Sequence, residues 1–165
     1  MRGLICCMCM FLFLTTAYAT DDLQGKITAI DIEGGTIEVS GVKIIAKSAK
    51  IENLNDMKCT PAALKVGDSV EVDGIFSGPA EMTATKIEQE GVVQDKIEGI
   101  LEAVDCAART LMISGILVKV PAGTFLEGKH DLPIKLEELT VGTRIECEGT
   151  WTGSRELTAG KIEVE

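Results

Sequence analysis

Four carboxylates have a spacing that could place them in pairs on one face of a strand. Glu71 and Asp73 lie two residues apart, and so do Glu146 and Glu148 in a second, similar segment. Side chains two apart on a strand project from the same face, so each pair could offer oxygen ligands to a hard cation such as Ca²⁺. The competing interpretation is a solvated strand face paired with lysines of the neighbouring strand. No D-x-D-x-D-G loop accompanies the acids, so we expect no bound metal and keep them only as weak metal candidates.

The cysteines allow two kinds of chemistry. Cys106 and Cys147 stand where the other half of the chain has Ile32 and Val72, which favours buried thiols acting as small apolar side chains. The alternative is a Cys106–Cys147 disulfide in an oxidising compartment, which requires Cα atoms within about 7 Å. Cys59 lies in an expected loop, either as a reactive or intermolecular thiol or as a packing residue.

Three further side chains invite a binding role. Phe76 and Trp151 occupy equivalent places near the end of an expected strand, where an aromatic ring either stacks a sugar or base in a groove or fills the interior. His130 is the sole histidine, and without a second His or a Cys-x-x-Cys it indicates an exposed loop residue rather than a metal ligand. We therefore predict no catalytic residue and no cofactor, and a protein that is not an enzyme.

Composition narrows the classes of partner. The chain has 165 residues, with 26 acidic and 16 basic side chains and a formal net charge of −10. Nucleic-acid binding requires clustered Lys and Arg, so this acidity argues against it. A chain of this length holds one ordinary domain or two very small ones.

The first 19 residues are typical of a secretory signal peptide. Met1-Arg2 supplies a short basic start, residues 3–14 are uncharged and apolar, and residues 17–19 form an A-x-A cleavage pattern. A retained membrane anchor or a lipoprotein are the alternatives. The apolar run is marginal for a span of about 20 residues, and its three cysteines lie inside the run rather than after it. Cleavage would leave a mature chain of net charge −11 with three cysteines, no membrane span and a periplasmic or secreted location.

The remainder of the chain is a duplication. Residues 25–41 align with 99–115, and 64–88 with 139–163, giving 18 identities in 42 positions. We therefore predict a first repeat over 20–92 and a second over 93–165.

Each repeat has the alternation of a small antiparallel β structure. Expected strands in the first repeat are 26–33, 36–40, 42–46, 69–76 and 81–88, and those in the second are 99–106, 110–114, 116–120, 143–151 and 156–164. The order of three strands, a connector and two strands predicts an all-β fold of two tandem five-stranded antiparallel OB-like barrels. One sandwich shared by both halves is the alternative.

Three blocks of sequence carry a family resemblance. They read G-x-[IL]-x-A-[IV]-D with T-[IL]-x-[VI]-S-G, then L-x-VG-x-x-[VI]-E-x-x-G, then E-[ML]-T-A-x-K-IE, and each occurs twice. This pattern resembles the bacterial domain of unknown function family numbered 5666, across nearly all of 24–163. The resemblance implies a small OB-like β-barrel in exported or envelope proteins, and it implies no activity.

Together these features predict an exported binding or interaction module of the bacterial cell envelope. Its partner would be an envelope protein or a small ligand, and not a nucleic acid. An acidic periplasmic protein that binds cations is the alternative function.

Overall fold

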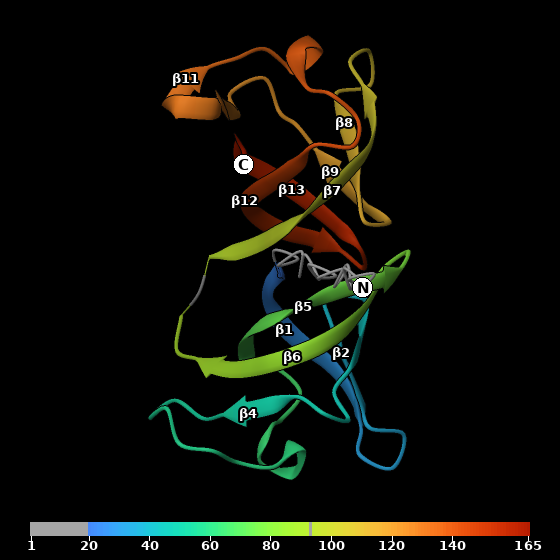
Figure 1. Ribbon diagram of the computed structural model, residues 1–165, viewed down its shortest axis with the longest axis vertical. Coiled ribbons are helices and arrows are strands. Elements are labelled where there is room, and N and C mark those ends of the chain that lie inside the picture. The colour runs from blue at the N-terminus through green and yellow to red at the C-terminus, as the bar shows by residue number, and fades with distance from the viewer. Residues whose placement is uncertain (1–19, 93) are drawn as a thin grey trace, which may run out of the picture.

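The computed structural model describes residues 20–92 and 94–165, and the predicted signal peptide, 1–19, lies outside these residues (Figure 1). The described chain is all-β, with thirteen strands and three short 3₁₀ turns. The first repeat contains β1 (Asp21–Asp31), β2 (Thr36–Val39), β3 (Val42–Ile45), β4 (Lys50–Glu52), η1 (Pro61–Ala63), β5 (Ser69–Gly78) and β6 (Glu81–Glu90). The second contains β7 (Asp95–Asp105), β8 (Thr110–Ile113), β9 (Ile116–Lys119), β10 (Phe125–Gly128), η2 (Lys129–Asp131), β11 (Leu132–Pro133), η3 (Leu136–Glu138), β12 (Arg144–Gly153) and β13 (Glu156–Val164).

The prediction of two tandem five-stranded antiparallel barrels is wrong. All thirteen strands are hydrogen-bonded into one sheet, coiled as a β-solenoid of about three turns, rather than two separate barrels. β1 and β7 pair with each other and carry the hydrogen bonding from one repeat into the next. The pairing is also not purely antiparallel, because β3 and β4 run parallel to β6, and β9 and β10 run parallel to β13.

The two repeats nevertheless use their equivalent strands in the same way. In the first, the pairings lead from β1 through β2, β3, β6 and β5 back to β1. In the second they lead from β7 through β8, β9, β13 and β12 back to β7. The tandem repeat is therefore confirmed at the level of strand pairing.

The core lies on the inner face of these long strands. Val70 and Val72 of β5 are fully buried, as are Ile145 and Cys147 of β12, which is what the alternation predicts. Gly74 and Gly149 mark equivalent β-bulges, where the register of each hairpin shifts by one residue. The connectors between the third and fourth expected strands, residues 48–63 and 121–139, contain the short strands β4, β10 and β11.

None of the helices among residues 20–92 and 94–165 is long and apolar enough to span a membrane.

Candidate functional site

The junction between the repeats is built on a local two-fold relation. In the β1–β7 pairing, Leu23 stands opposite Ile97, its own equivalent in the second repeat, and both are fully buried. On either side, Asp22 stands opposite Glu98, and Gln24 opposite Lys96. Because the register is centred on equivalent residues, every backbone position at this junction has a counterpart in the other repeat.

The hairpin turns repeat this relation. The backbone N–H of Ala80, in the β5–β6 turn, donates to the Ser114 carbonyl at 2.8 Å. Its equivalent, the N–H of Arg155, donates to the Ser40 carbonyl at 2.9 Å. Each repeat thus hydrogen-bonds its turn to the other repeat, so the junction is held by backbone contacts at three places.

Charged side chains cover the outer face of the sheet at this junction. Two rows of residues cross the six strands β6, β5, β1, β7, β12 and β13, and every position except Gln24 is charged, with eight carboxylates and three lysines. The rows are Glu88, Glu71, Gln24, Lys96, Glu148, Lys161 and Lys86, Asp73, Asp22, Glu98, Glu146, Glu163. The predicted carboxylate pairs therefore belong to one continuous acidic surface rather than to two separate sites.

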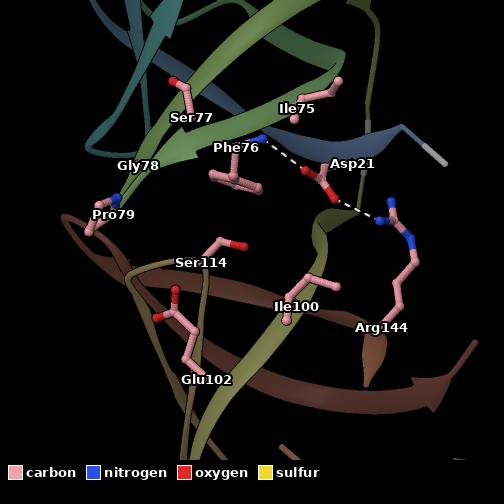
Figure 2. A pocket seen from close by; sticks show the side chains of 10 residues that line it. All are labelled: Asp21, Ile75, Phe76, Ser77, Gly78, Pro79, Ile100, Glu102, Ser114 and Arg144. Atoms are coloured by element: carbon pink, nitrogen blue, oxygen red, sulfur yellow. Dashed lines mark hydrogen bonds and ion pairs between the residues drawn. The ribbon is translucent and has the colours of Figure 1, made fainter. Parts of the chain in front are cut away.

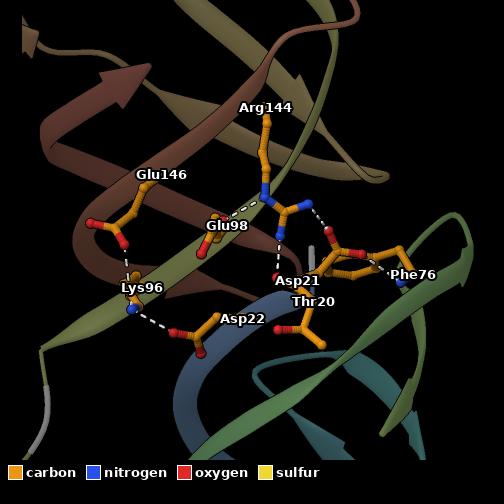
Figure 3. Close-up of polar contacts among 8 residues, drawn as sticks. All are labelled: Thr20, Asp21, Asp22, Phe76, Lys96, Glu98, Arg144 and Glu146. Atoms are coloured by element: carbon orange, nitrogen blue, oxygen red, sulfur yellow. Dashed lines mark hydrogen bonds and ion pairs between the residues drawn. The ribbon is translucent and has the colours of Figure 1, made fainter. Parts of the chain in front are cut away.

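Two basic side chains of the second repeat lie among these acids (Figure 3). Lys96 Nζ lies 2.5 Å from Asp22 Oδ2 and 3.4 Å from Glu146 Oε2. Arg144 donates to Glu98 Oε1 at 2.5 Å, to Asp21 Oδ1 at 2.7 Å and to the Thr20 carbonyl. We call Asp21, Asp22, Lys96, Glu98, Arg144 and Glu146 the junction cluster.

Burial shifts the pKa of several of these groups. The pKa of Asp22 is raised because burial penalises its charged form and the charges of Asp73 and Glu98 repel it, which together outweigh the lowering by Lys96. The pKa of Glu71 is raised by burial and by the charge of Asp22. Burial acts to lower the pKa of Lys96, but hydrogen bonds and charges from Asp22 and Glu146 outweigh it, so this pKa is raised. A carboxyl whose pKa is raised by folding favours the folded state most at low pH, and that contribution is lost as the pH rises through the raised pKa.

One carboxylate oxygen of the cluster is left without a partner. Asp22 Oδ1 is fully buried and accepts no hydrogen bond. Asp22, Glu71 and Asp73 each place an oxygen so that all three lie within 4.8 Å of one another, the one such group of potential metal ligands among residues 20–92 and 94–165. In the second repeat, the position equivalent to Asp22 holds Lys96, so Glu146 and Glu148 meet a cation instead of a third acid.

A pocket opens beside the cluster, between the two repeats (Figure 2). It has a volume of about 450 Å³ and is lined by residues of both repeats, namely Asp21, Ile75, Phe76, Ser77, Gly78, Pro79, Ile100, Glu102, Ser114 and Arg144. We call it the junction pocket. Its size falls in the range typical of small-molecule sites.

The predicted aromatic residues both lie at this junction. Phe76 and Trp151 are partly buried against the core, and their backbone N–H groups donate to Asp21 Oδ2 and Asp95 Oδ2, each at 2.8 Å. Phe76 lines the junction pocket, whereas the Trp151 indole N–H donates to the Gln24 carbonyl of the other repeat at 2.8 Å. The two aromatic residues therefore occupy equivalent positions, as the sequence predicts. They differ because only Trp151 forms a side-chain hydrogen bond to the other repeat, whereas Phe76 lines the junction pocket.

The lysines opposite the candidate acids form ion pairs with other carboxylates, and the two candidate cysteines are not joined by a disulfide. Lys86 pairs with Glu52 and Glu88, and Lys161 with Glu127 and Glu163, so these lysines neutralise their own repeat rather than the four candidate acids. Cys106 and Cys147 are free thiols, and the expectation of a buried thiol agrees with Cys147 but is wrong for Cys106, which is exposed. Cys147 stands opposite Ile97, and Cys106 lies nine residues further along the chain, just past the end of β7. At ~3.3 Å per residue this places the two cysteines well beyond the reach of about 7 Å that a disulfide requires.

The remaining candidates do not join the junction. Cys59 is free, half-buried and packed against the core, which favours its interpretation as a packing residue. His130 is exposed in η2 with a left-handed backbone, at φ 67°.

Sequence reasoning missed Asp21, Asp22, Lys96 and Arg144. A signal was present, because Lys96 aligns with Asp22 and Arg144 with Ser69, and both are charge changes between otherwise similar repeats.

Two repeats of one all-β unit, joined by strand pairing around a shared charged cluster and pocket, define a duplicated all-β protein. The chain belongs to the family described as "Domain of unknown function (DUF5666)", whose model matches residues 24–88 and again 98–163. No curated protein matches the chain.

Proposed function

We propose that this protein is an exported, non-enzymatic interaction module of the bacterial cell envelope, and that it binds a small ligand at the junction pocket. The observation that carries the proposal is the composition of the pocket, which needs residues from both repeats held by the β1–β7 pairing. Binding sites at the boundary between two units are common, because each unit supplies one wall.

The chemistry of the cluster favours binding over catalysis. Arg144 and Lys96 are engaged with carboxylates, and Asp21 also accepts the Phe76 N–H. Groups that neutralise one another position a ligand and hold the repeats together, whereas general acid–base work needs a group free to exchange a proton with the substrate. Efficient hydrolysis of common glycoside, ester or phosphate substrates by the purified protein would contradict this part of the proposal.

Export is tested by the mass of the protein made in a bacterial host. We expect the periplasmic or secreted fraction to contain a chain that begins at Thr20, because residues 17–19 provide the small side chains that signal peptidase requires. The control is Ala19→Arg, which should keep the leader attached. A full-length chain found only in the cytoplasm would contradict export.

Cation binding is the second candidate function, and the orphaned Asp22 Oδ1 favours it. A hard cation such as Ca²⁺ prefers carboxylate oxygens, and Asp22, Glu71 and Asp73 would supply three of them. Bound cation would also relieve the burial cost that raises the pKa of Asp22 and Glu71.

Calorimetry and thermal melting with Ca²⁺, Mg²⁺ and Cu²⁺ test this candidate. We expect binding heat and a higher melting temperature with at least one cation, both lost in Asp73→Asn. The matched control is Glu148→Gln, at the equivalent position of the second repeat, which should leave binding unchanged because Lys96 stands there in place of Asp22. Absence of heat and of any melting shift at millimolar cation would discard the candidate.

A further inference from the structure

The junction pocket has a counterpart on the other side of the local two-fold. The counterpart pocket is lined by Lys26, Ser40, Asp95, Thr150 and Trp151, and its volume is about 280 Å³. These five residues are the repeat equivalents of Ile100, Ser114, Asp21, Ile75 and Phe76, which line the junction pocket. The same place in the fold is therefore open on one side of the molecule and reduced on the other.

The aromatic side chain is one difference between the two pockets. Trp151 reaches across to the first repeat, where its indole nitrogen lies close over Gly25 and donates to the Gln24 carbonyl at 2.8 Å. Phe76 lies over the equivalent glycine, Gly99, but is smaller and has no such donor. The Phe76 ring therefore fills less of its place over the glycine than the indole of Trp151 does.

The walls of the junction pocket are apolar and open to solvent. Ile75 and Ile100 are 48% and 44% exposed, and with Phe76 and Pro79 they form an apolar surface. In the counterpart pocket Thr150 and Lys26 replace the two isoleucines. Exposed aliphatic side chains gathered around one cavity are characteristic of a site that an apolar group covers.

Among the described residues that line the pocket, the one free charged group is an acceptor, and the Ser114 hydroxyl beside it can both donate and accept. Arg144 and Asp21 face each other at one end and are engaged with each other and with their neighbours. At the other end, Glu102 is exposed, and one of its oxygens accepts the Gly115 N–H at 3.0 Å. Figure 2 shows this carboxylate directed toward Ser114 and the turn at Pro79. A ligand in the pocket thus contacts an apolar wall and the negatively charged Glu102 carboxylate, which can accept a further hydrogen bond.

We propose that the junction pocket binds a small organic cation: a primary ammonium group carried on an apolar body. This inference rests on the proposed binding function and specifies its ligand class. The ammonium group donates to the Glu102 carboxylate, and the apolar body lies against Ile75, Ile100 and the ring of Phe76. The contact combines a charge-assisted hydrogen bond with burial of apolar surface.

The test is an NMR titration of backbone amides with three probes of similar shape. These are 2-phenylethylammonium, the neutral 2-phenylethanol and the anionic 3-phenylpropionate. For the cation we expect saturable shifts at residues 75–78, 100–102 and 114, with a dissociation constant on the order of 1 mM for so small a probe. The alcohol should bind about tenfold more weakly, and the anion should not bind.

Three variants locate the binding. Phe76→Trp installs the residue that the counterpart pocket already accommodates and should abolish cation binding by filling the space. Glu102→Gln keeps the shape and the hydrogen bond to Gly115 and should weaken binding about tenfold. Trp151→Phe, on the other side of the two-fold, should leave binding at the junction pocket unchanged. Melting curves confirm that each variant is folded.

The outcomes separate the ligand class from the proposed function. Equal or tighter binding of the alcohol or the anion, blocked by Phe76→Trp, would overturn the cationic ligand while leaving a binding pocket. Binding of the cation that is unaffected by Phe76→Trp and Glu102→Gln would overturn the site. No shift with any probe at 20-fold the expected dissociation constant would overturn the ligand class, and export with no hydrolytic activity would still support the wider proposal.

Discussion

Replacing Lys96 by methionine should lower the free energy of unfolding by about 2–4 kcal/mol at pH 7. Lys96 is one-fifth exposed and lies against Asp22, whose side chain is 11% exposed and whose second carboxylate oxygen has no partner. Removing one member of a buried ion pair leaves an uncompensated charge, which typically costs about 3–5 kcal/mol. The residual exposure of both groups reduces that figure here.

This effect should depend on pH in a defined direction. Without Lys96, the pKa of Asp22, already raised by burial, rises further, so the folded variant takes up a proton more readily than the unfolded chain. Its stability is therefore retained below the unfolded pKa of Asp and lost as the pH rises through the folded pKa. Urea unfolding at pH 4 and pH 7 should show the larger deficit at pH 7.

Two comparisons make the Lys96 result specific. Lys43→Met removes an exposed ion pair with Glu81, at 2.8 Å, and should cost less than about 0.5 kcal/mol. Adding Asp22→Asn to Lys96→Met should restore most of the lost stability at pH 7, because the uncompensated charge is gone. Equal losses for Lys96→Met and Lys43→Met would contradict a buried charge at the junction.

Replacing Gly149 by alanine should lower the free energy of unfolding by about 3 kcal/mol and the melting temperature by roughly 6–12 °C. Gly149 lies at the β12 bulge, where an added Cβ would lie well inside contact distance of the Thr158 carbonyl oxygen. Both groups belong to the backbone of a hairpin, so neither can move aside without disturbing the strand pairing.

The matched control for this substitution lies on the same hairpin. Gly160 is exposed on β13, and a Cβ added there meets its nearest neighbour, the Glu148 carbonyl oxygen, at an ordinary 3.9 Å. We expect Gly160→Ala to change stability by less than about 0.5 kcal/mol. Thermal and urea unfolding of both variants measure the difference. A Gly149→Ala protein as stable as Gly160→Ala would show that the bulge does not bring the backbones together as described.

The repeats could be predicted from sequence, but the way they join could not. The alternation of Val70 and Val72 with charged residues correctly indicates a strand with one buried face. However, β1 and β7 each begin with a polar pair, Asp21-Asp22 and Asp95-Lys96 respectively. A polar pair before an apolar run does not by itself predict a strand. These pairs extend β1 and β7 because Leu23 and Ile97 bury each other. Which strands pair across repeats depends on three-dimensional register, which period-two patterning does not encode.

Only part of the candidate site could be predicted, because the rest of it also depends on which strands pair. The carboxylate pairs at Glu71 and Asp73 could be identified because their spacing is local. Their neighbours Asp22 and Lys96 come from β1 and β7, and only the strand pairing brings them into the same row. The junction pocket depends on side chains from four strands and two turns, so no stretch of sequence outlines it.

The register at Leu23 and Ile97 has a consequence for the charges beside it. If one repeat formed this junction with an identical copy, the residues at positions 22 and 96 would be the same, and an acid or a lysine there would lie diagonally across the axis from another of its own sign. Joining the copies in one chain frees the two positions to differ. Asp22 and Lys96 are such a pair, 2.5 Å apart, and their attraction is one that a homodimer of this unit could not make. Covalent linkage thus allows an ion pair at a position where a symmetric dimer could place only two identical side chains.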